Sequence, residues 1–289
     1  MSAPDEETAL LGLAPVAPDR TLAYGAHPDQ VVDLYGPWGG GRGPLVVLLH
    51  GGFWRAAYDR RHLSPLAAEL AGRGLPVALA EYRRVGAGGG APQTFEDVAA
   101  AVEAVAAEAA ASGVDVDGGA GAGHGLVLIG HSAGGHLALL AAARPGTAVT
   151  RVLAVSPVAD LARAHELGLS GGAVAELLAA TGPDGDEEPA GGGPAGGAGF
   201  RERLAAADPL HHPPPAALSV TILHGTADPD VPPELSRRYA AAHPAATDLH
   251  ELPGVGHYAP VTPGTAACRT LLDHLRPSPP GASSSGSSA

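Results

Sequence analysis

The chain has 289 residues, a net charge of −13 at pH 7 and 45% hydrophobic residues, which fits a single α/β domain with a large core. The acidic balance disfavours nucleic-acid binding, because phosphate contacts need a basic face. No apolar run reaches the ~18 residues of a membrane span, and the acidic N-terminus lacks the basic start of a signal peptide. We therefore expect no membrane association and a cytoplasmic location.

Apolar, strand-like runs alternate with Ala-rich helical stretches along most of the chain. We expect a flexible segment over 1–19, because it is polar and contains prolines. The apolar runs that follow predict strands at 21–25, 30–35, 44–50, 75–82, 125–130, 151–156, 218–225 and, at an edge, 247–252. Helical stretches are predicted at 60–73, 94–111, 134–143, 174–180 and 263–275. This alternation predicts an α/β fold with a mainly parallel sheet flanked by helices.

One segment, 158–210, interrupts the alternation. It contains a helical stretch and then the Gly-, Pro- and acid-rich run 181–199, which predicts disorder. We interpret 158–210 as a cap-like insertion over the site, while a surface insertion remote from the site remains the alternative. The main domain then spans 20–276, and the Ser-rich tail 277–289 is predicted to be disordered.

The strongest motif is Gly130-His131-Ser132-Ala133-Gly134, between a buried strand and a helix. It fits the G-x-S-x-G nucleophile elbow, in which a sharp turn exposes the serine hydroxyl. The helix that begins there directs its N-terminal amides toward the substrate oxygen. Ser132 is therefore the candidate nucleophile, and the N–H of Ala133 is a candidate oxyanion donor.

A second motif, His50-Gly51-Gly52-Phe53-Trp54, ends an earlier buried strand. Ester hydrolysis passes through an oxyanion, and glycines let backbone N–H groups approach that oxygen. We predict an oxyanion hole formed by Gly51, Gly52 and Phe53 together with Ala133. Trp54 either lines the substrate pocket or packs in the core, and a plain Gly-rich turn is the alternative for the whole motif.

Two further loops follow late strands. His224-Gly225-Thr226-Ala227-Asp228 offers Asp228 as the carboxylate that orients a histidine, with Asp230 as the competing candidate. Gly254-Val255-Gly256-His257-Tyr258 offers His257 as general base and Tyr258 as a pocket residue. The order Ser132, Asp228, His257 is the chain order that a G-x-S-x-G hydrolase uses. Turns whose polar residues only cap the backbone are the alternative.

Five segments together carry a family resemblance: HGGFW (50–54), EYR (81–83), GHSAGG (130–135), HGTADPDVP (224–232) and GVGHY (254–258). Over about 20–276 the chain resembles the α/β-hydrolase superfamily. Within it the chain is similar to the carboxylesterase and arylformamidase (kynurenine formamidase) branch, through YGAHPDQVVDLYGP and the form of the HGGFW loop. The resemblance implies hydrolysis of a carboxylic ester or of an N-formyl aryl amide such as N-formylkynurenine. The Gly-rich insertions at 113–125 and 181–199 depart from it.

Residue usage excludes several other mechanisms. The chain has no Lys and no Asn, which rules out a Schiff-base lysine, a Ser-Lys dyad, a Walker loop and a Cys-His-Asn triad. A single cysteine, Cys268, allows neither an internal disulfide nor a multi-cysteine metal site. We therefore predict no metal and no organic cofactor. The substrate is expected to be a small ester or amide; the oligomeric state stays open.

Three alternative functions remain. A prolyl-oligopeptidase-like peptidase would share the triad, but the sequence lacks propeller-forming repeats. A haloalkane or epoxide hydrolase would place Asp at the elbow, where this chain has Ser132. A non-catalytic binding protein on the same fold is the third alternative. Arg55, Arg83 and Arg84 either pair with a substrate carboxylate or form structural ion pairs.

Overall fold

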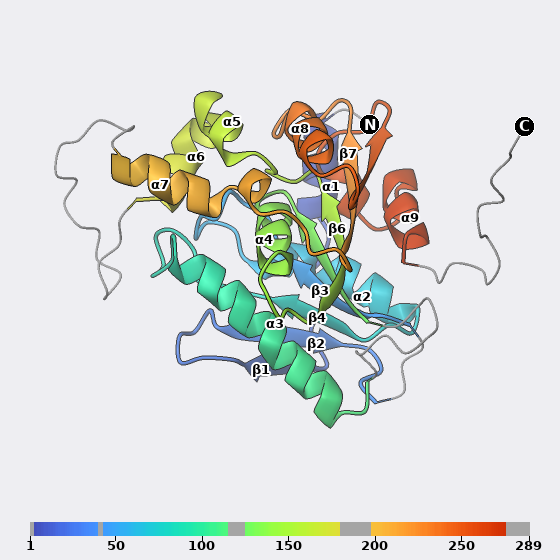
Figure 1. Ribbon diagram of the computed structural model, residues 1–289. Helices are drawn as coiled ribbons and strands as arrows, with labels where there is room; N and C mark the ends of the chain where they lie inside the picture. The colour runs from blue at the N-terminus through green and yellow to red at the C-terminus, as the bar shows by residue number, and fades with distance from the viewer. Residues whose placement is uncertain (1–2, 40–42, 115–124, 180–197, 276–289) are drawn as a thin grey trace, which may run out of the picture.

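A single eight-stranded sheet runs through the computed structural model, which describes residues 3–39, 43–114, 125–179 and 198–275 (Figure 1). Its order is β1-β2-β4-β3-β5-β6-β7-β8. The β1–β2 and β2–β4 pairs are antiparallel, and the five other pairs are parallel. The strands are β1 (Arg20–Ala23), β2 (Val31–Tyr35), β3 (Leu45–Leu49), β4 (Val77–Ala80), β5 (Leu126–His131), β6 (Val149–Val155), β7 (Ser219–Gly225) and β8 (Thr247–Leu252). The predicted mainly parallel sheet is confirmed, with β8 at an edge.

Helices cover both faces of this sheet. They are α1 (Ala3–Leu11), α2 (Ser64–Gly72), α3 (Gln93–Ala111), α4 (Ala133–Ala142), α5 (Leu161–Glu166), α6 (Leu169–Leu177), α7 (Ala198–Ala207), α8 (Glu234–Ala242) and α9 (Ala266–Asp273). Short 3₁₀ turns form η1 (Arg60–Leu63), η2 (Pro209–His211) and η3 (Ala259–Val261). The sequence did not predict α1, α5, α7 or α8.

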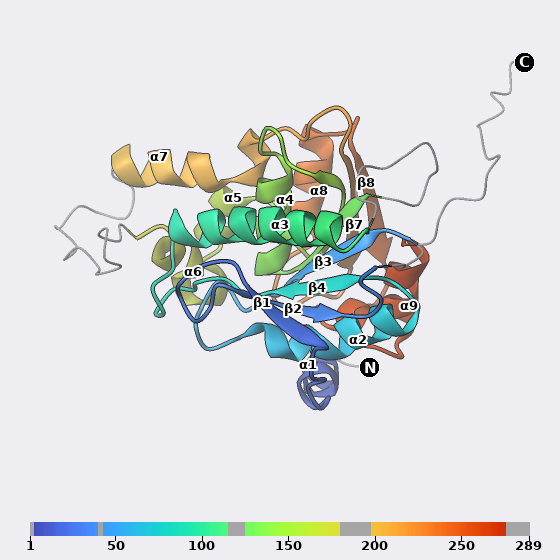
Figure 2. The same cartoon turned by 90° about the horizontal axis from the view of Figure 1, so that it is seen from below.

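The alternation of side chains along β3 explains why the sheet needs helices on both faces. Successive residues of a strand point to opposite sides. Leu45, Val47 and Leu49 pack in the core formed with α3, α4 and α8. Val46 and Leu48 pack in the core formed with α2 and α9. Figure 2 shows these two groups of helices on opposite sides of the sheet. A strand buried on both faces reads as a continuous apolar run, which is what the sequence contains.

The N-terminal segment differs from the prediction of flexibility over 1–19. Residues 3–11 form α1, which docks through two buried side chains one helical turn apart, Glu6 and Leu10. Leu10 belongs to the core on the α2 and α9 face. One inward carboxylate and one inward leucine give little apolar periodicity, so this helix was not visible in the pattern.

The described residues of 158–210 form α5, α6 and α7, which gather at one end of the sheet, on the left in Figure 1. The predicted disorder over 181–199 lies outside the described residues except at 198–199, which begin α7. The tail 277–289 and most of the Gly-rich run 113–125 also lie outside the described residues. No helix in the described part of the chain has the length and apolar character needed to span a bilayer.

Candidate functional site

Ser132 occupies the sharp turn between β5 and α4, with φ 57° and ψ −118°. A non-glycine residue with positive φ is uncommon, and such strain is concentrated at functional sites. The flanking glycines are needed for space. A Cβ on Gly130 would lie 2.2 Å from the carbonyl oxygen of Gly134, and a Cβ on Gly134 would lie 2.2 Å from that of Leu49. The motif therefore forms the predicted elbow, packed against the end of β3.

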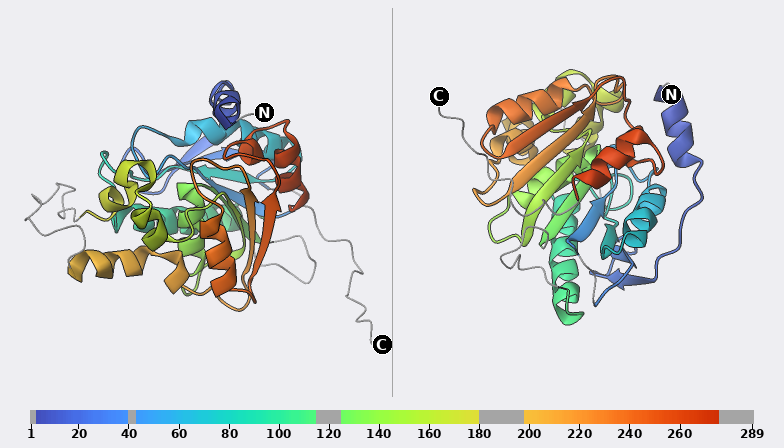
Figure 3. Two further views of the ribbon diagram at one scale, coloured as in Figure 1. Left: turned by 90° about the horizontal axis from the view of Figure 1, so that it is seen from above. Right: turned by 90° about the vertical axis from the view of Figure 1, so that its right-hand side faces the viewer.

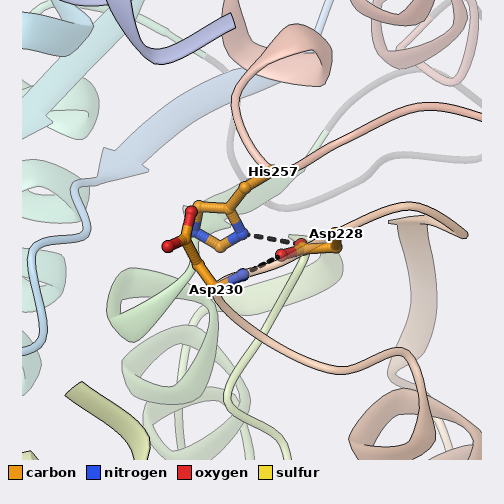
Figure 4. A group of neighbouring side chains, drawn as sticks. All are labelled: Asp228, Asp230 and His257. Atoms are coloured by element: carbon orange, nitrogen blue, oxygen red, sulfur yellow. Dashed lines mark hydrogen bonds and ion pairs between the residues drawn. The ribbon is translucent and has the colours of Figure 1, made fainter. Parts of the chain in front are cut away.

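The imidazole of His257 is held by Asp228. Its Nδ1–H donates to Oδ2 of Asp228 across 2.7 Å, as Figure 4 shows. The other oxygen, Oδ1, accepts the backbone N–H groups of Asp230 and Val231, each at 2.9 Å. Burial alone would raise the pKa of Asp228, but hydrogen bonds from His224 and His257 hold that pKa far below its usual range. The carboxylate is therefore charged, and it fixes which nitrogen of His257 carries the proton.

Ser132 and His257 line one cavity of about 190 Å³. Its wall is built by segments from the whole length of the chain: Glu7, Leu11, Gly52, Phe53, Arg55, Tyr58, His62, His131, Ser132, Ser170, Asp230, His257 and Tyr258. Next to the elbow, Nε2–H of His131 donates to the carbonyl oxygen of His257 across 3.0 Å. This bond ties the loop that carries His257 to the end of β5.

The loop after β3 presents free backbone N–H groups beside the serine. Among the described residues, the N–H groups of Gly52, Phe53 and Ala133 have no hydrogen-bond acceptor. A Cβ on Gly51 would lie 2.9 Å from Cβ of Ser132, so the loop touches the elbow directly. Gly52 and Phe53 both have positive φ, at 102° and 49°. The structure thus brings the predicted oxyanion residues to the serine.

The buried residues His50 and Glu81 support the loop after β3. His50 donates from Nδ1 to the carbonyl oxygen of Gly51 and from Nε2 to Oε1 of Glu81, both at 2.8 Å. Burial raises the pKa of Glu81, but His50 and nearby donors lower it more, to about 2. Tyr82 stacks on the His50 ring and donates its hydroxyl to the His50 carbonyl oxygen. Two residues of the EYR segment therefore shape the loop after β3, and His50 supports it.

The structure corrects one predicted pocket residue. Trp54 is 1% exposed and packs in the core against the ring of His136, so it does not line the cavity. Phe53 and Tyr258 do line it. Phe53 and Trp54 both have positive φ, at 49° and 59°, yet Trp54 packs in the core and Phe53 lines the cavity. Sequence alone could not distinguish the two orientations.

The three arginines considered for a substrate carboxylate are all in ion pairs. Arg55 pairs with Glu176 at 2.7 Å, Arg83 with Asp97 at 2.7 Å, and Arg84 with Asp29 at 3.1 Å. Arg55 also donates to the hydroxyl and the carbonyl oxygen of Ser170 in α6. These contacts join the loop after β3 to α6, and Ser170 itself lines the cavity.

Several cavity residues carried no signal in the sequence. Tyr58 and His62 belong to no motif, and Glu7 and Leu11 lie in the unpredicted helix α1. Nδ1–H of His62 donates to the carbonyl oxygen of Asp59, and burial lowers the His62 pKa to about 4. This ring is therefore neutral near pH 7.

One arrangement of the described residues has the spacing of a metal site. Ligand atoms of Asp228, Asp230 and His257 lie within 4.8 Å of one another. Two of the three residues, His257 and Asp228, are joined by a 2.7 Å hydrogen bond, which orients the imidazole.

Comparison with known proteins decides the family. A family model described as "Putative esterase" matches residues 111–267, more than half of the chain, and a second model, BD-FAE, matches residues 32–156. The chain belongs to this esterase family. This esterase-family chain is also 31% identical over 154 residues to the probable isoprenylcysteine alpha-carbonyl methylesterase of Arabidopsis thaliana. That match covers 53% of the chain and 34% of the plant protein, so the chain spans about a third of its relative's length.

Solved structures show the same fold. Esterase B from Lactobacillus rhamnosis, bound to an inhibitor, aligns with a TM-score of 0.69 and 20% identity over 95% of this chain and 91% of its own. Esterase 2 of Thermogutta terrifontis, phosphonylated by sarin, aligns with a TM-score of 0.63 and 23% identity over 90% and 94% of the two chains. A carbohydrate esterase from gut microbiota gives 0.67 and 19% over 91% and 98%. The α/β-hydrolase fold predicted from the sequence is confirmed, and the arylformamidase branch stays a prediction.

Proposed function

We propose that this esterase-family chain is a serine carboxylesterase that hydrolyses small esters through an acyl-enzyme on Ser132. One observation carries the proposal: Asp228 holds His257 by a 2.7 Å hydrogen bond at a cavity that Ser132 also lines. A serine is a weak nucleophile unless an oriented base stands beside it. The strained turn places Ser132 in the wall of the cavity, and the charged carboxylate orients the base.

The reaction follows from this arrangement. Nε2 of His257 takes the Ser132 proton while Oγ bonds to the carbonyl carbon of the substrate. The tetrahedral oxyanion collapses, the bond to the leaving alcohol breaks, and His257 gives its proton to that oxygen. A water molecule then adds to the acyl carbon and gives a proton to His257. The bond between Ser132 Oγ and the acyl carbon breaks, His257 returns the proton to Oγ, and the carboxylic acid leaves.

The N–H groups of Gly52, Phe53 and Ala133 stabilise the oxyanion. They lack acceptors among the described residues, which leaves them available to a substrate oxygen. One such donor is typically worth about 10²–10³ in rate. Their geometry is fixed before substrate binds, because the hydrogen bonds of His50 to Gly51 and Glu81 hold the loop after β3 in place.

The cavity favours short, uncharged or cationic substrates. Its volume of about 190 Å³ is below the ~300 Å³ at which drug-sized ligand pockets begin. Two carboxylates, Glu7 and Asp230, line it, and the side chain of neither pairs with a described cation. Its arginine, Arg55, is already paired with Glu176. The names of two similar proteins, the methylesterase and the carbohydrate esterase, also describe enzymes that act on esters.

A formamidase acting on an N-formyl aryl amide is the second candidate, favoured because a formyl group fits so small a cavity. N-formylkynurenine is a zwitterion, so Glu7 and Asp230 would repel its carboxylate and attract its ammonium group, and charge does not separate the two candidates. We rank ester hydrolysis first because the family model that matches this chain describes an esterase. Turnover of p-nitrophenyl acetate, p-nitrophenyl octanoate and N-formylkynurenine, compared at equal concentration, separates the two candidates. Faster turnover of the formamide would reverse the ranking, and preference for octanoate would contradict the short acyl site.

Replacement of the nucleophile tests the mechanism. Ser132→Ala should lower kcat on p-nitrophenyl acetate by several orders of magnitude and abolish labelling by a fluorophosphonate probe. Ser156→Ala is the matched control, because Ser156 is also buried, also has positive φ, and its hydroxyl has no hydrogen-bond partner in the described part of the chain. It should keep both activity and labelling. Retained turnover in folded Ser132→Ala, or a peptide map that places the label elsewhere, would reject the proposal.

A further inference from the structure

The carboxylate of Glu6 lies against the loop that carries His257. Oε1 accepts the N–H of Gly256 at 3.0 Å, and Oε2 accepts the N–H groups of Tyr258 at 3.2 Å and Ala259 at 3.0 Å. These donors flank His257 on both sides in the chain. Glu6 is only 3% exposed, and Figure 3 shows α1 beside the C-terminal part of the chain.

A buried carboxylate is costly unless donors surround it, and hydrogen bonds to a charged acceptor are the strong ones. Here the donors are backbone groups of the loop and not side chains. The fit is close, since a Cβ on Gly256 would lie 2.7 Å from Oε2 of Glu6. The contact therefore fixes the path of the loop more than it fixes the helix alone.

Two other hydrogen bonds position His257 directly. Its carbonyl oxygen accepts from His131 at 3.0 Å, and its ring donates to Asp228 at 2.7 Å. Both contacts act on His257 itself, whereas Glu6 holds the residues before and after it. Without Glu6 the loop loses three hydrogen bonds, accepted by two carboxylate oxygens, on the side that α1 covers.

We infer that Glu6 is a positioning residue that holds the imidazole of His257 where it can take the proton of Ser132. Helix α1 thus contributes to the active site. The inference rests on the proposed serine mechanism. The same helix also places Glu7 and Leu11 in the cavity wall. A displacement of about 1 Å at a reacting group can cost about a hundredfold in rate.

Two substitutions at Glu6 test the inference. Glu6→Ala removes every acceptor, and Glu6→Gln retains one oxygen. We expect kcat on p-nitrophenyl acetate to fall ten- to hundredfold in Glu6→Ala and less in Glu6→Gln, with KM within about threefold of the parent. Asp208→Asn is the matched control, because buried Asp208 also accepts backbone N–H groups, from Ala162 and Leu210, far along the chain from His257. It should lower the melting temperature and leave kcat within about twofold.

A second variant approaches the same contact from the loop. Gly256→Ala places a methyl group against Glu6 and should reproduce the loss of kcat with unchanged KM. Because both changes break one contact, the double variant should lose no more than the worse single variant. This variant keeps the test informative if Glu6→Ala fails to fold.

The results separate this inference from the proposed function. If Ser132→Ala is inactive but folded Glu6→Gln and Gly256→Ala both keep kcat within twofold, Glu6 has a structural role only. Equal losses in Asp208→Asn would also overturn the positioning role. Activity retained in Ser132→Ala would instead overturn the serine mechanism itself.

Discussion

His257 and Asp228 form a hydrogen bond of 2.7 Å, although Asp230, two residues further on, also lies beside the ring (Figure 4). Asp230 gives its backbone N–H to the Asp228 carboxylate. Asp228 is thus supported by Asp230 as it holds the imidazole. The two carboxylates have different environments, because the side chain of Asp228 is fully buried and that of Asp230 faces the cavity.

This difference predicts unequal effects of the same substitution. Asp228→Asn replaces the acceptor with an amide, which no longer selects the tautomer that can accept the serine proton. We expect kcat to fall by about 10³–10⁴ with the fold retained. Asp230→Asn should cost less than tenfold on a neutral ester. Steady-state kinetics with circular dichroism compares the two, and an equal loss in both would contradict the assignment of Asp228.

Glycine at the elbow is predicted to be indispensable for folding. Gly134→Ala would place a methyl carbon 2.2 Å from the backbone carbonyl oxygen of Leu49, which cannot move without disrupting β3. We expect a loss of more than about 3 kcal/mol in the free energy of unfolding, or no folded protein. Gly72→Ala is the control, because its Cβ would meet no atom within 4 Å at the end of α2. It should be neutral or stabilise by up to about 1 kcal/mol. Denaturant titration of both variants decides the matter, and a stable Gly134→Ala would contradict the packing argument.

The sequence predicted the parts of the molecule whose local pattern reflects their burial. Strands such as β3 are continuous apolar runs because both faces of the sheet are covered. The glycines around Ser132 and in the HGGFW loop were visible because close backbone contact admits no other residue there. The motif residues that the structure brings around Ser132, such as Gly52, Phe53 and His257, were therefore found from their local pattern and their order.

Other features had no local pattern. Glu6 contacts residues about 250 positions away, and nothing in MSAPDEETALL indicates which carboxylate is buried. The orientation of Trp54 depends on the packing of the core beside His136. Such features depend on long-range packing, which a pattern of neighbouring residues does not encode.

The ion pair of Arg55 with Glu176 predicts coupling between the loop after β3 and the insertion. Both side chains are partly exposed, at 30% and 43%, so breaking the pair should cost less than about 1 kcal/mol of stability. We expect Arg55→Gln and Glu176→Gln to change KM by similar factors of a few-fold, and the double variant to change it no further. Additive effects, or no change in KM with any ester, would mean that the insertion does not act as a cap.

His136 predicts a loss of stability in mild acid. Burial lowers its pKa to about 4, and among the described residues only Nε2 has a hydrogen-bond partner, the carbonyl oxygen of Ala207 at 2.9 Å. Protonation would add an N–H at Nδ1, which is buried without a partner. The unfolded chain, where the pKa is about 6.5, binds the proton first, so stability falls as pH drops from about 6.5 toward 4. This histidine alone should account for about 2 kcal/mol between pH 7 and pH 5. His136→Gln, whose amide can still donate to Ala207, should remove that share of the pH dependence in urea titrations. An unchanged slope between pH 7 and pH 5 would show that His136 is not a source of the acid sensitivity.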